Sequence, residues 1–418
     1  MNRTQKLWVI ALAMTLLVSV TGVSIAPAQE QTGGAPGDWL ARYTAARTLG
    51  LGGAFVAAAD EPLGVIWNPA AVSLMFQNEA HFETARLYEG TSLYSFGFAI
   101  PSQKLPSFGL TILSLNSGDF ERTSELNESL GSFSEGDLAF ILTASKSLTP
   151  RFALGTNLKI IRQSVEEFGA TGVGADFGFL YDITPTVRLG ASILNLGGPN
   201  LTLRQAKETY PAQFRWGLAT RVFRGRGLLS AEFDHSSGLG TSVHGGAEYW
   251  LYPMVALRVG YNDNAPAAGM SYRFPSGLRL DYGLSDQELG MTHRLGVSFR
   301  FGGFFANSEA DPPVFSPIGQ QSVTKFHLKS RTKAETQSWR LEIVDKTKNV
   351  QRQFGGKGTP PAHVMWDGKD ETGLPLPDGM YRYVLVVMDE EGREISGRER
   401  LVEITTGGPQ GSVPVVVN

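Results

Sequence analysis

The sequence predicts an all-β protein, in which an antiparallel transmembrane β-barrel of about fourteen strands follows an N-terminal plug and precedes a small periplasmic β-sandwich. Three observations lead to this prediction: residues that alternate between apolar and polar, connections that alternate between short and longer, and the lack of another means of crossing a membrane. After the N-terminal segment no run of about 18 apolar residues remains, so no transmembrane helix is expected. The chain has no cysteine, which excludes disulfides, a lipoprotein anchor and thiolate metal sites.

The alternation is clearest between residues 213 and 302. In the run 213–222, Phe214, Trp216 and Leu218 fall on one face and Arg215 and Arg221 on the other, because strand side chains alternate with period two. A soluble sandwich would bury the apolar face, whereas an outer-membrane barrel turns it to lipid and turns the polar face to the lumen. The alternation alone does not separate these two interpretations.

The number of strand-like runs is even, as in single-chain bacterial barrels. From Asn78 onward the runs are 78–87, 91–100, 108–115, 137–147, 152–164, 171–181, 187–194, 213–222, 228–235, 242–251, 255–262, 266–273, 278–284 and 292–302.

The connections favour the barrel. Short turns occur at 148–151, 182–186, 224–226, 253 and 275–277, and longer connections between them at 116–136, 195–212 and 285–291. Short periplasmic turns and longer outside loops are typical of outer-membrane barrels. Aromatic residues stand beside the short turns, where a membrane barrel has an interfacial girdle. These residues are Phe152, Tyr181, Phe223, Tyr252, Phe274 and Phe301.

The first 28 residues predict a secretory signal peptide. Arg3 and Lys6 form its positive region, 7–25 is mostly apolar, and 26–28 is a small-residue cleavage site. Residues 29–77 follow as a leader and plug. A secreted chain with alternating strands and no apolar helix predicts the outer membrane of a Gram-negative-type cell, in contact with its lipid.

Residues 41–75 are rich in glycine and alanine, lack strand alternation and contain Pro62 and Pro69, so we expect them to pack inside the barrel of 78–303 as a plug. Charged residues of the polar strand faces would then line the lumen, and because their signs are mixed we expect internal ion pairs, with a selective binding site as the alternative. These lumen-lining candidates are Arg215, Arg221, Glu232, Asp234, Glu248, Arg258, Arg279, Asp281, Arg294 and Arg300.

A second domain follows the barrel. Residues 304–321 contain 311–313 (Asp-Pro-Pro) and 316–317 (Ser-Pro) and predict a linker. Residues 322–405 contain short strand-like runs with turn signals between them, which predicts a β-sandwich, and 406–418 predict a loose tail. An even number of barrel strands returns the chain to the side where it began, so this domain is expected in the periplasm.

Catalytic and metal motifs are weak. The spacing of Asp367, Asp370 and Asp378 is not that of a calcium loop and predicts turns instead. The six histidines lack metal-ligand spacing, 50–53 lacks the Gly-Lys-Ser/Thr of a phosphate loop, and no G-x-S-x-G element is present. The formal charge of −3 gives no general attraction for nucleic acid. We therefore expect no enzyme, cofactor, metal or nucleic-acid partner.

The plug segment resembles that of the PorV/PorQ-type outer-membrane proteins, within the FadL-like barrel group, which carry A-R-x-x-G-[ML]-G-G-A-[FY]-V-A and then W-N-P-A. Here the central residues of the pattern are Arg47, Gly50, Gly52, Gly53, Trp67, Asn68 and Pro69. Residues 195–198 (Asn-Leu-Gly-Gly) are also similar, and the resemblance covers 40–303. It implies a fourteen-stranded barrel with an N-terminal plug. FadL-like members carry hydrophobic molecules across the outer membrane, whereas PorV belongs to the type IX secretion machinery and holds cargo.

The second domain resembles the FlgD-like immunoglobulin-type module, on 314–317 (Val-Phe-Ser-Pro), 366–373 (Trp-Asp-Gly-Lys-Asp-Glu-Thr-Gly) and 377–381 (Pro-Asp-Gly-Met-Tyr). Two hypotheses follow for a membrane barrel: transport of a hydrophobic solute, or a scaffold that holds secretion machinery, cargo or a periplasmic protein. A secreted, non-membrane β-protein is the third.

Overall fold

The computed structural model describes residues 37–406 except 38, 43–44, 76, 89, 103–104, 127, 150, 204–205, 224, 237–239, 263–264, 288–289, 303–304, 320–321, 333, 391 and 393. The predicted signal peptide, the start of the leader and the tail beyond residue 406 lie outside the described residues. The described chain divides between Phe305 and Ala306 into two compact units, a barrel unit and a C-terminal unit.

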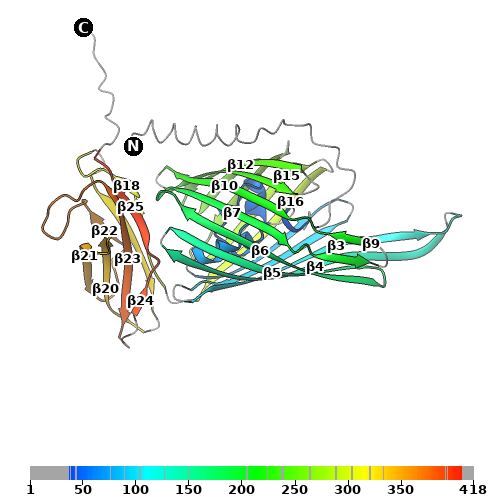
Figure 1. Ribbon diagram of the computed structural model, residues 1–418, viewed down its shortest axis with the longest axis horizontal. Helices are drawn as coiled ribbons and strands as arrows, with labels where there is room; N and C mark the ends of the chain where they lie inside the picture. Colours follow the sequence, from blue (N-terminus) through cyan, green and yellow to red (C-terminus); the bar gives the residue numbers. More distant parts are fainter. Residues whose placement is uncertain are drawn as a thin grey trace, which may run out of the picture. The chain divides into compact units, whose positions relative to one another are not determined.

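Fourteen antiparallel strands close into one barrel, with β1 paired to β16, which confirms the predicted fourteen-stranded barrel (Figure 1). They are β1 (Asn78–Arg86), β2 (Ser92–Ile100), β3 (Ser107–Thr123), β4 (Ser129–Thr149), β5 (Phe152–Val165), β6 (Phe168–Asp182), β7 (Val187–Leu196), β10 (Gln213–Val222), β11 (Gly227–Ser236), β12 (Gly240–Tyr252), β13 (Val255–Asn262), β14 (Ala265–Arg273), β15 (Leu278–Gln287) and β16 (Gly290–Phe301). We call the end where β1 begins and β16 ends the terminal end, and the opposite end the distal end.

The two faces of the wall differ as the alternation predicts. In β10, Phe214 is 43% exposed and its neighbour Arg215 is 5% exposed. Leu257 and Val297 are likewise exposed on the outside, whereas Arg258 is buried. An exposed apolar face around an enclosed polar one suits a lipid bilayer and does not suit a soluble sandwich.

The connections at the distal end differ from the prediction. Residues 116–136, predicted as a loop, are mostly strand, because β3 continues to Thr123 and β4 starts at Ser129; this hairpin extends beyond its neighbours (Figure 1). Residues 285–291 are also mainly strand, and 195–212 contain a separate hairpin of β8 (Asn200–Leu203) and β9 (Ala206–Thr209). Beyond the apolar band neither face of a strand meets lipid, so its residues need not alternate between apolar and polar. The sequence pattern therefore did not reveal these parts of the strands.

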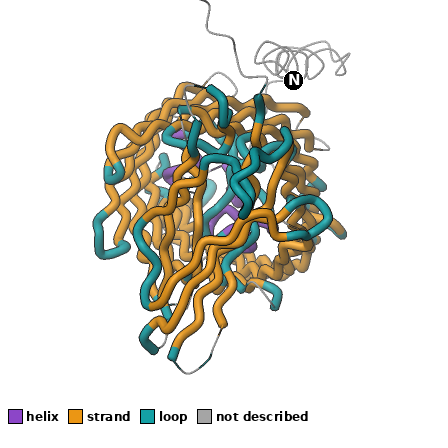
Figure 2. The backbone as a smooth tube through the Cα atoms, turned by 90° about the vertical axis from the view of Figure 1, so that its left-hand side faces the viewer, coloured by secondary structure: helices purple, strands orange, loops and turns teal. Residues whose placement is uncertain are grey.

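The plug consists of short helical turns inside the barrel. They are α3 (Ala46–Gly50), η1 (Pro62–Ile66) and η2 (Pro69–Leu74), and a further turn, α2 (Trp39–Arg42), precedes them. The turn α3 lies against β13–β16, η1 against β1–β3 and η2 against β3–β6, so the strands enclose residues 45–75 from opposite sides. Figure 2 shows the helical turns within the ring of strands. In the part of the chain that the structure describes, no helix has the length and apolar character needed to cross a membrane.

The C-terminal unit has two main sheets around one core. Their strands are β17 (Phe305–Asp311), β18 (Val314–Phe315), β19 (Thr324–Arg331), β20 (Thr336–Val344), β21 (Val350–Lys357), β22 (His363–Trp366), β23 (Gly379–Asp389), β24 (Glu394–Ser396) and β25 (Arg400–Ile404). One sheet has the order β17-β19-β22 and the other β18-β25-β23-β20-β21, with β24 beside β23. Phe326, Leu341 and Trp366 are buried in the core that the sheets share.

The predicted linker 304–321 is not only a linker. It supplies β17 and β18, and its residues Ala306, Ala310 and Phe315 are buried in the core of the C-terminal unit. The prolines at 312, 313 and 317 led to the linker prediction, but they stand beside these strands and outside them, where no ladder hydrogen bond is lost.

Candidate functional site: a plug inside the barrel

Glycines of the wall allow the plug backbone to approach the strands closely. At ten of them an added Cβ atom would lie 3.3 Å or less from a plug atom, as at Gly260, where it would lie 2.1 Å from the amide nitrogen of Gly52. The ten are Gly97, Gly109, Gly155, Gly178, Gly190, Gly217, Gly246, Gly260, Gly269 and Gly283. They lie on ten different strands, so the inner surface is shaped to the plug around most of its circumference.

Two buried carboxylates of the wall bind backbone amides of the plug. Glu232 of β11 accepts hydrogen bonds through one oxygen from the amides of Phe55 (2.7 Å) and Val56 (2.6 Å). Glu83 of β1 accepts one from the amide of Ala46, at the start of α3 (2.6 Å). These amides have no strand partner, and a carboxylate forms stronger hydrogen bonds than a neutral acceptor, so both contacts fix the plug.

Uncharged side chains bind the other side of the plug. The amide group of Asn68 donates to the carbonyl oxygens of Val56 and Phe179, both at 2.9 Å, and so joins the plug to β6. From the wall, Asn157 of β5 donates to the carbonyl of Val65 (2.9 Å). Ser192 of β7 donates to the carbonyl of Trp67 (2.7 Å).

Arg47 is the central cation of the plug. Its guanidinium pairs with Asp60 and Glu61 within the plug and with Glu248 of β12, at 3.0 Å from Nε to Oε2. Arg47 and Glu248 are both buried. Removing one member of such a buried network leaves the others uncompensated, which typically costs about 3–5 kcal/mol.

The network continues across β13 and β15. Arg258 bonds to the same Glu248 (2.6 Å), and Arg279 bonds to Asp281 (2.7 Å) and to Glu61 of the plug (2.8 Å). Among the described residues, no group of three or more histidine or acidic side chains is arranged to hold a metal ion. The charges of this part of the lumen therefore neutralise one another and connect plug to wall.

The predicted plug residues each have a place in this packing. Gly52 and Gly53 adopt positive φ angles of 63° and 85°, which other residues rarely adopt. Gly50 lies against Gly269 of β14, and the ring of Trp67 packs edge-on against Phe55. Arg47 and Asn68 make the polar contacts given above, and Pro69 begins η2, where its missing N–H leaves no helical bond unmade.

The ten predicted lumen residues occupy the inward-facing positions of β10 to β16. Arg215, Glu232, Asp234, Glu248, Arg258, Arg279, Asp281 and Arg294 are buried, whereas near the terminal end Arg300 is partly exposed and Arg221 is exposed. Arg215 bonds to Glu232 (3.2 Å), and Arg300 bonds to Glu79 of β1 (2.8 Å).

Several residues that hold the plug were not identified from the sequence. Glu83 stands on the polar face of the run 78–87, together with Glu79, so alternation could have identified it. Asn157 and Ser192 gave no such signal, because small polar residues are ordinary on the inner face of a barrel strand. The sequence showed that glycine is abundant, but it did not indicate which glycines contact the plug.

A continuous apolar cluster crosses the lumen along the other part of the wall, and we call it the apolar seam. Its wall residues include Leu93, Ala99, Leu113, Ala139, Ile141 and Ile161, from β2 to β5. Its plug residues include Val65, Ala71, Val72 and Met75. The seam extends from the distal end to Ala99, which pairs with Glu79 close to the start of β1.

A lid covers the distal end of the seam. It consists of α2, the paired strands β8 and β9, and Tyr210. Trp39, Leu40, Leu201 and Tyr210 are buried members of the apolar cluster. The indole nitrogen of Trp39 donates to the Tyr210 hydroxyl at 3.2 Å, which joins the two parts of the lid.

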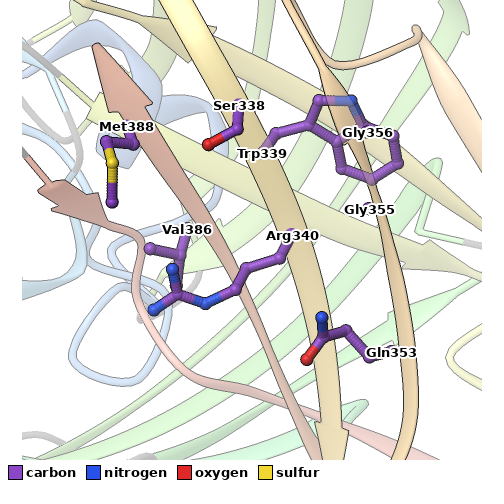
Figure 3. Close-up of a pocket in the computed structure, with 8 residues that line it drawn as sticks. All are labelled: Ser338, Trp339, Arg340, Gln353, Gly355, Gly356, Val386 and Met388. Atoms are coloured by element: carbon purple, nitrogen blue, oxygen red, sulfur yellow. The ribbon is translucent and has the colours of Figure 1, made fainter. Parts of the chain in front are cut away.

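The C-terminal unit has a recess of about 420 Å³ on β20, β21 and β23 (Figure 3). Arg340 extends over it, close to Val386, and Gln353 and Met388 lie at its border. The Arg340 charge is already paired with Glu342 (2.7 Å) and Glu394 (3.1 Å). The recess is therefore a weak candidate for an anion site.

The fold and the enclosed segment define a transmembrane β-barrel whose lumen is plugged by its own N-terminal residues. No family model and no curated protein matches the chain. Among solved structures it is similar to the toluene transporter TbuX of Ralstonia pickettii, at 15% identity over 62% of this chain and 98% of that chain, with a TM-score of 0.47.

Two further structures are similar to the same degree. A FadL homologue of Pseudomonas aeruginosa is 13% identical over 62% of this chain and 98% of that one, with a TM-score of 0.47. The toluene transporter TodX of Pseudomonas putida is 14% identical over 60% and 95%, with a TM-score of 0.45. At these values, the assignment of a function rests on the residues of this chain.

Proposed function

We propose that this protein lies in the outer membrane and carries small hydrophobic molecules across it, along the apolar seam between the plug and strands β2–β5. The observation that carries the proposal is the seam itself: one buried apolar cluster that extends from the lid to the terminal end. A lumen that served water or ions would need polar surface along this route.

The two sides of the plug are held differently, and this difference supports a route. Hydrogen bonds to the plug come from β1, β4–β7, β11, β12 and β15, through residues such as Glu83, Glu232 and Asn157. Strands β2 and β3 meet the plug through apolar contact, Gly97 against Leu63 and Gly109 against Val72. Separation of this side exposes apolar surface, and an apolar solute would cover that surface again.

Access from the distal end would require the lid to move. The Trp39–Tyr210 hydrogen bond joins neutral groups, which contributes about 0.5–1.5 kcal/mol net. Leu40 and Leu201 add apolar contacts to the lid, which a hydrophobic solute can replace.

A reversible tether across the seam tests the proposal. Val72 Cγ2, a position that the Sγ atom of a cysteine can take, lies 3.3 Å from the place where a Cβ atom of Gly109 would stand. The two sulfur atoms of the double variant Val72→Cys/Gly109→Cys can therefore approach the bonded distance of about 2.0 Å. The chain has no other cysteine, so oxidation would join only these two positions. The measurement is the rate at which an apolar naphthylamine fluorophore enters cells with an intact outer membrane.

The wild-type protein should raise the uptake rate above that of cells without it, and oxidation of the double variant should reduce the rate to that background. The reduced form of the same variant is the matched control and should transport. Equal uptake by oxidised and reduced forms would refute a route through the seam.

We also propose the PorV/PorQ-type assignment and a FlgD-like immunoglobulin-type module, 322–405, in the periplasm. Trp366, the first residue of the motif 366–373, packs against Phe315 and Tyr381, and Asp370 accepts hydrogen bonds from the amides of Thr372 and Leu374, as a turn requires. The secretion-scaffold hypothesis predicts a protein partner for this module. Crosslinking of the full chain in cells, with and without residues 306–418, tests it, and identical products in both would contradict it.

A further inference from the structure

An apolar groove lies on the outside of the barrel wall, across β4, β5, β6, β7 and β10, and we call it the wall groove. It lies between two rows of outward side chains that the strand register places side by side. One row is Ala144, Thr156, Phe177, Ile193 and Phe214, and the other is Lys146, Leu154, Phe179 and Ala191. These strands lie next to one another in Figure 1.

The groove is deep because its floor carries small residues. Between the rows, the floor is the backbone of inward-facing residues such as Gly155 and Gly178, and the plug residues Pro69 and Asn68 lie directly behind these two glycines. The volume is about 490 Å³ and the lining is almost wholly apolar. Large apolar side chains form its sides, and Phe177 and Phe214 are exposed there.

The dimensions of the wall groove suit a long acyl chain. It crosses from β4 to β10 over four strand spacings, which at about 4.8 Å each gives roughly 19 Å. Barrel strands tilt by about 40° from the membrane normal. A groove that runs perpendicular to the strands therefore lies at about 50° to the same normal. It therefore rises obliquely from the β4 side, close to the terminal end, towards the middle of the apolar band.

One end of the groove carries a charge. Among the fourteen described residues that line it, Lys146 alone is charged, and it lies on β4 three residues before that strand ends at Thr149, at the terminal end. A lysine near the membrane interface can extend its ammonium group to the headgroup level. An apolar groove with one cation at its interfacial end is complementary to a single phosphate joined to an acyl chain.

We propose that the wall groove is a binding site for a phospholipid of the periplasmic leaflet, with its phosphate at Lys146 and one acyl chain beside Ala144 along the floor of Gly155 and Gly178. This site is separate from the seam inside the barrel. The lipid site rests on the proposed location in the outer membrane and does not depend on transport. A result that refuted solute uptake would therefore not refute the lipid site.

Photolabelling of the full chain in nanodiscs tests the proposal. The probe is a phosphatidylglycerol with a diazirine near the end of one acyl chain, and mass spectrometry identifies the labelled residues. The variants are Lys146→Gln, which removes the charge, and Ala144→Phe, which fills the groove. Ala268→Phe is the matched control, since Ala268 is an outward alanine on β14, away from the groove. Heat-modifiable gel mobility confirms that each variant is folded, and Ala144→Leu replaces Ala144→Phe if that variant is not.

The wild-type protein should be labelled on β6, β7 and β10 beside the groove several-fold more than on β13–β15. Lys146→Gln should reduce this labelling about fivefold, the effect of one lysine on an anionic headgroup. Ala144→Phe should reduce it as strongly, and Ala268→Phe should leave it unchanged. Labelling spread evenly around the barrel would overturn the proposal. Labelling of the groove in the Lys146→Gln variant that equals labelling in the wild type would also overturn it. So would labelling of the groove by a diazirine hydrocarbon without a headgroup that equals labelling by the phospholipid probe.

Discussion

Replacement of Glu232 by alanine should release the middle of the plug from the wall. The carboxylate accepts the amides of Phe55 and Val56 through one oxygen, and its other oxygen bonds to Arg215. In Glu232→Ala both amides lose their acceptor while they remain buried. Arg215 retains Asp234 at 3.7 Å and the face of Trp67, so its charge is not left alone.

The size of the effect follows from the two amides. A buried donor without an acceptor costs about 1–3 kcal/mol, so two should destabilise the docked plug by about 4 kcal/mol, close to a thousandfold in its equilibrium. Glu232→Gln is the graded control, because its carbonyl oxygen can still accept both amides while the attraction to Arg215 is lost. We expect about a tenfold effect for this variant.

Hydrogen exchange read by mass spectrometry over residues 50–60 measures this opening directly. The amides of Phe55 and Val56 should exchange much faster in Glu232→Ala and slightly faster in Glu232→Gln, while the barrel strands keep their protection. Unchanged exchange in Glu232→Ala would refute the conclusion that this carboxylate fixes the plug.

Three further predictions concern packing and pH. Gly260→Ala should destabilise the barrel unit by about 1–3 kcal/mol, because the added Cβ would overlap the backbone of Leu51 and Gly52. Gly245→Ala is the control, because no atom lies within 4 Å of the Cβ it would add. Equal denaturation midpoints for the two variants would contradict the close fit of plug and wall. Trp366→Ala should destabilise the C-terminal unit by about 3–5 kcal/mol and make residues 306–406 of the full chain sensitive to limited proteolysis, whereas the barrel strands should stay resistant. Hydrogen bonds from Thr372 and Leu374 hold the pKa of the exposed Asp370 below its ordinary value. The carboxylate therefore contributes to stability at pH values above the unfolded-state pKa of about 3.9, and this contribution is lost as pH falls through the folded-state pKa. Proteolysis of the turn 367–376 should therefore increase at low pH in the wild type, and in Asp370→Asn it should be fast at every pH; a similar profile for both proteins would contradict this.

The barrel could be predicted because its wall repeats one rule. Each strand inside the apolar band must turn apolar residues to lipid, so Phe214 and Arg215 differ in exposure as their positions in the run require. The hairpin of β3 and β4 extends beyond that band, where no such requirement applies, and the sequence pattern predicted a loop there.

The site could be predicted only in part. The alternation revealed Glu232 and Glu248, because a charge on the inner face of a strand interrupts an apolar run. It did not reveal that these carboxylates bind Phe55 and Arg47, since contacts between distant segments depend on the closed barrel. The seam was also missed, because an inward Leu113 or Ile141 on a barrel strand resembles an ordinary strand residue.

Spin labelling along β16 tests the central claim, that the apolar face of the wall meets lipid while the polar face encloses the plug. Single cysteines at Leu295, Val297 and Phe299, and at Gly296 and Ser298, would carry the labels in the protein reconstituted in bilayers, since the chain has no cysteine of its own. Dissolved oxygen should relax the labels at 295, 297 and 299 strongly and those at 296 and 298 weakly, with a period of two. Uniformly low relaxation at all five positions would show that both faces are packed within protein, and would contradict the claim.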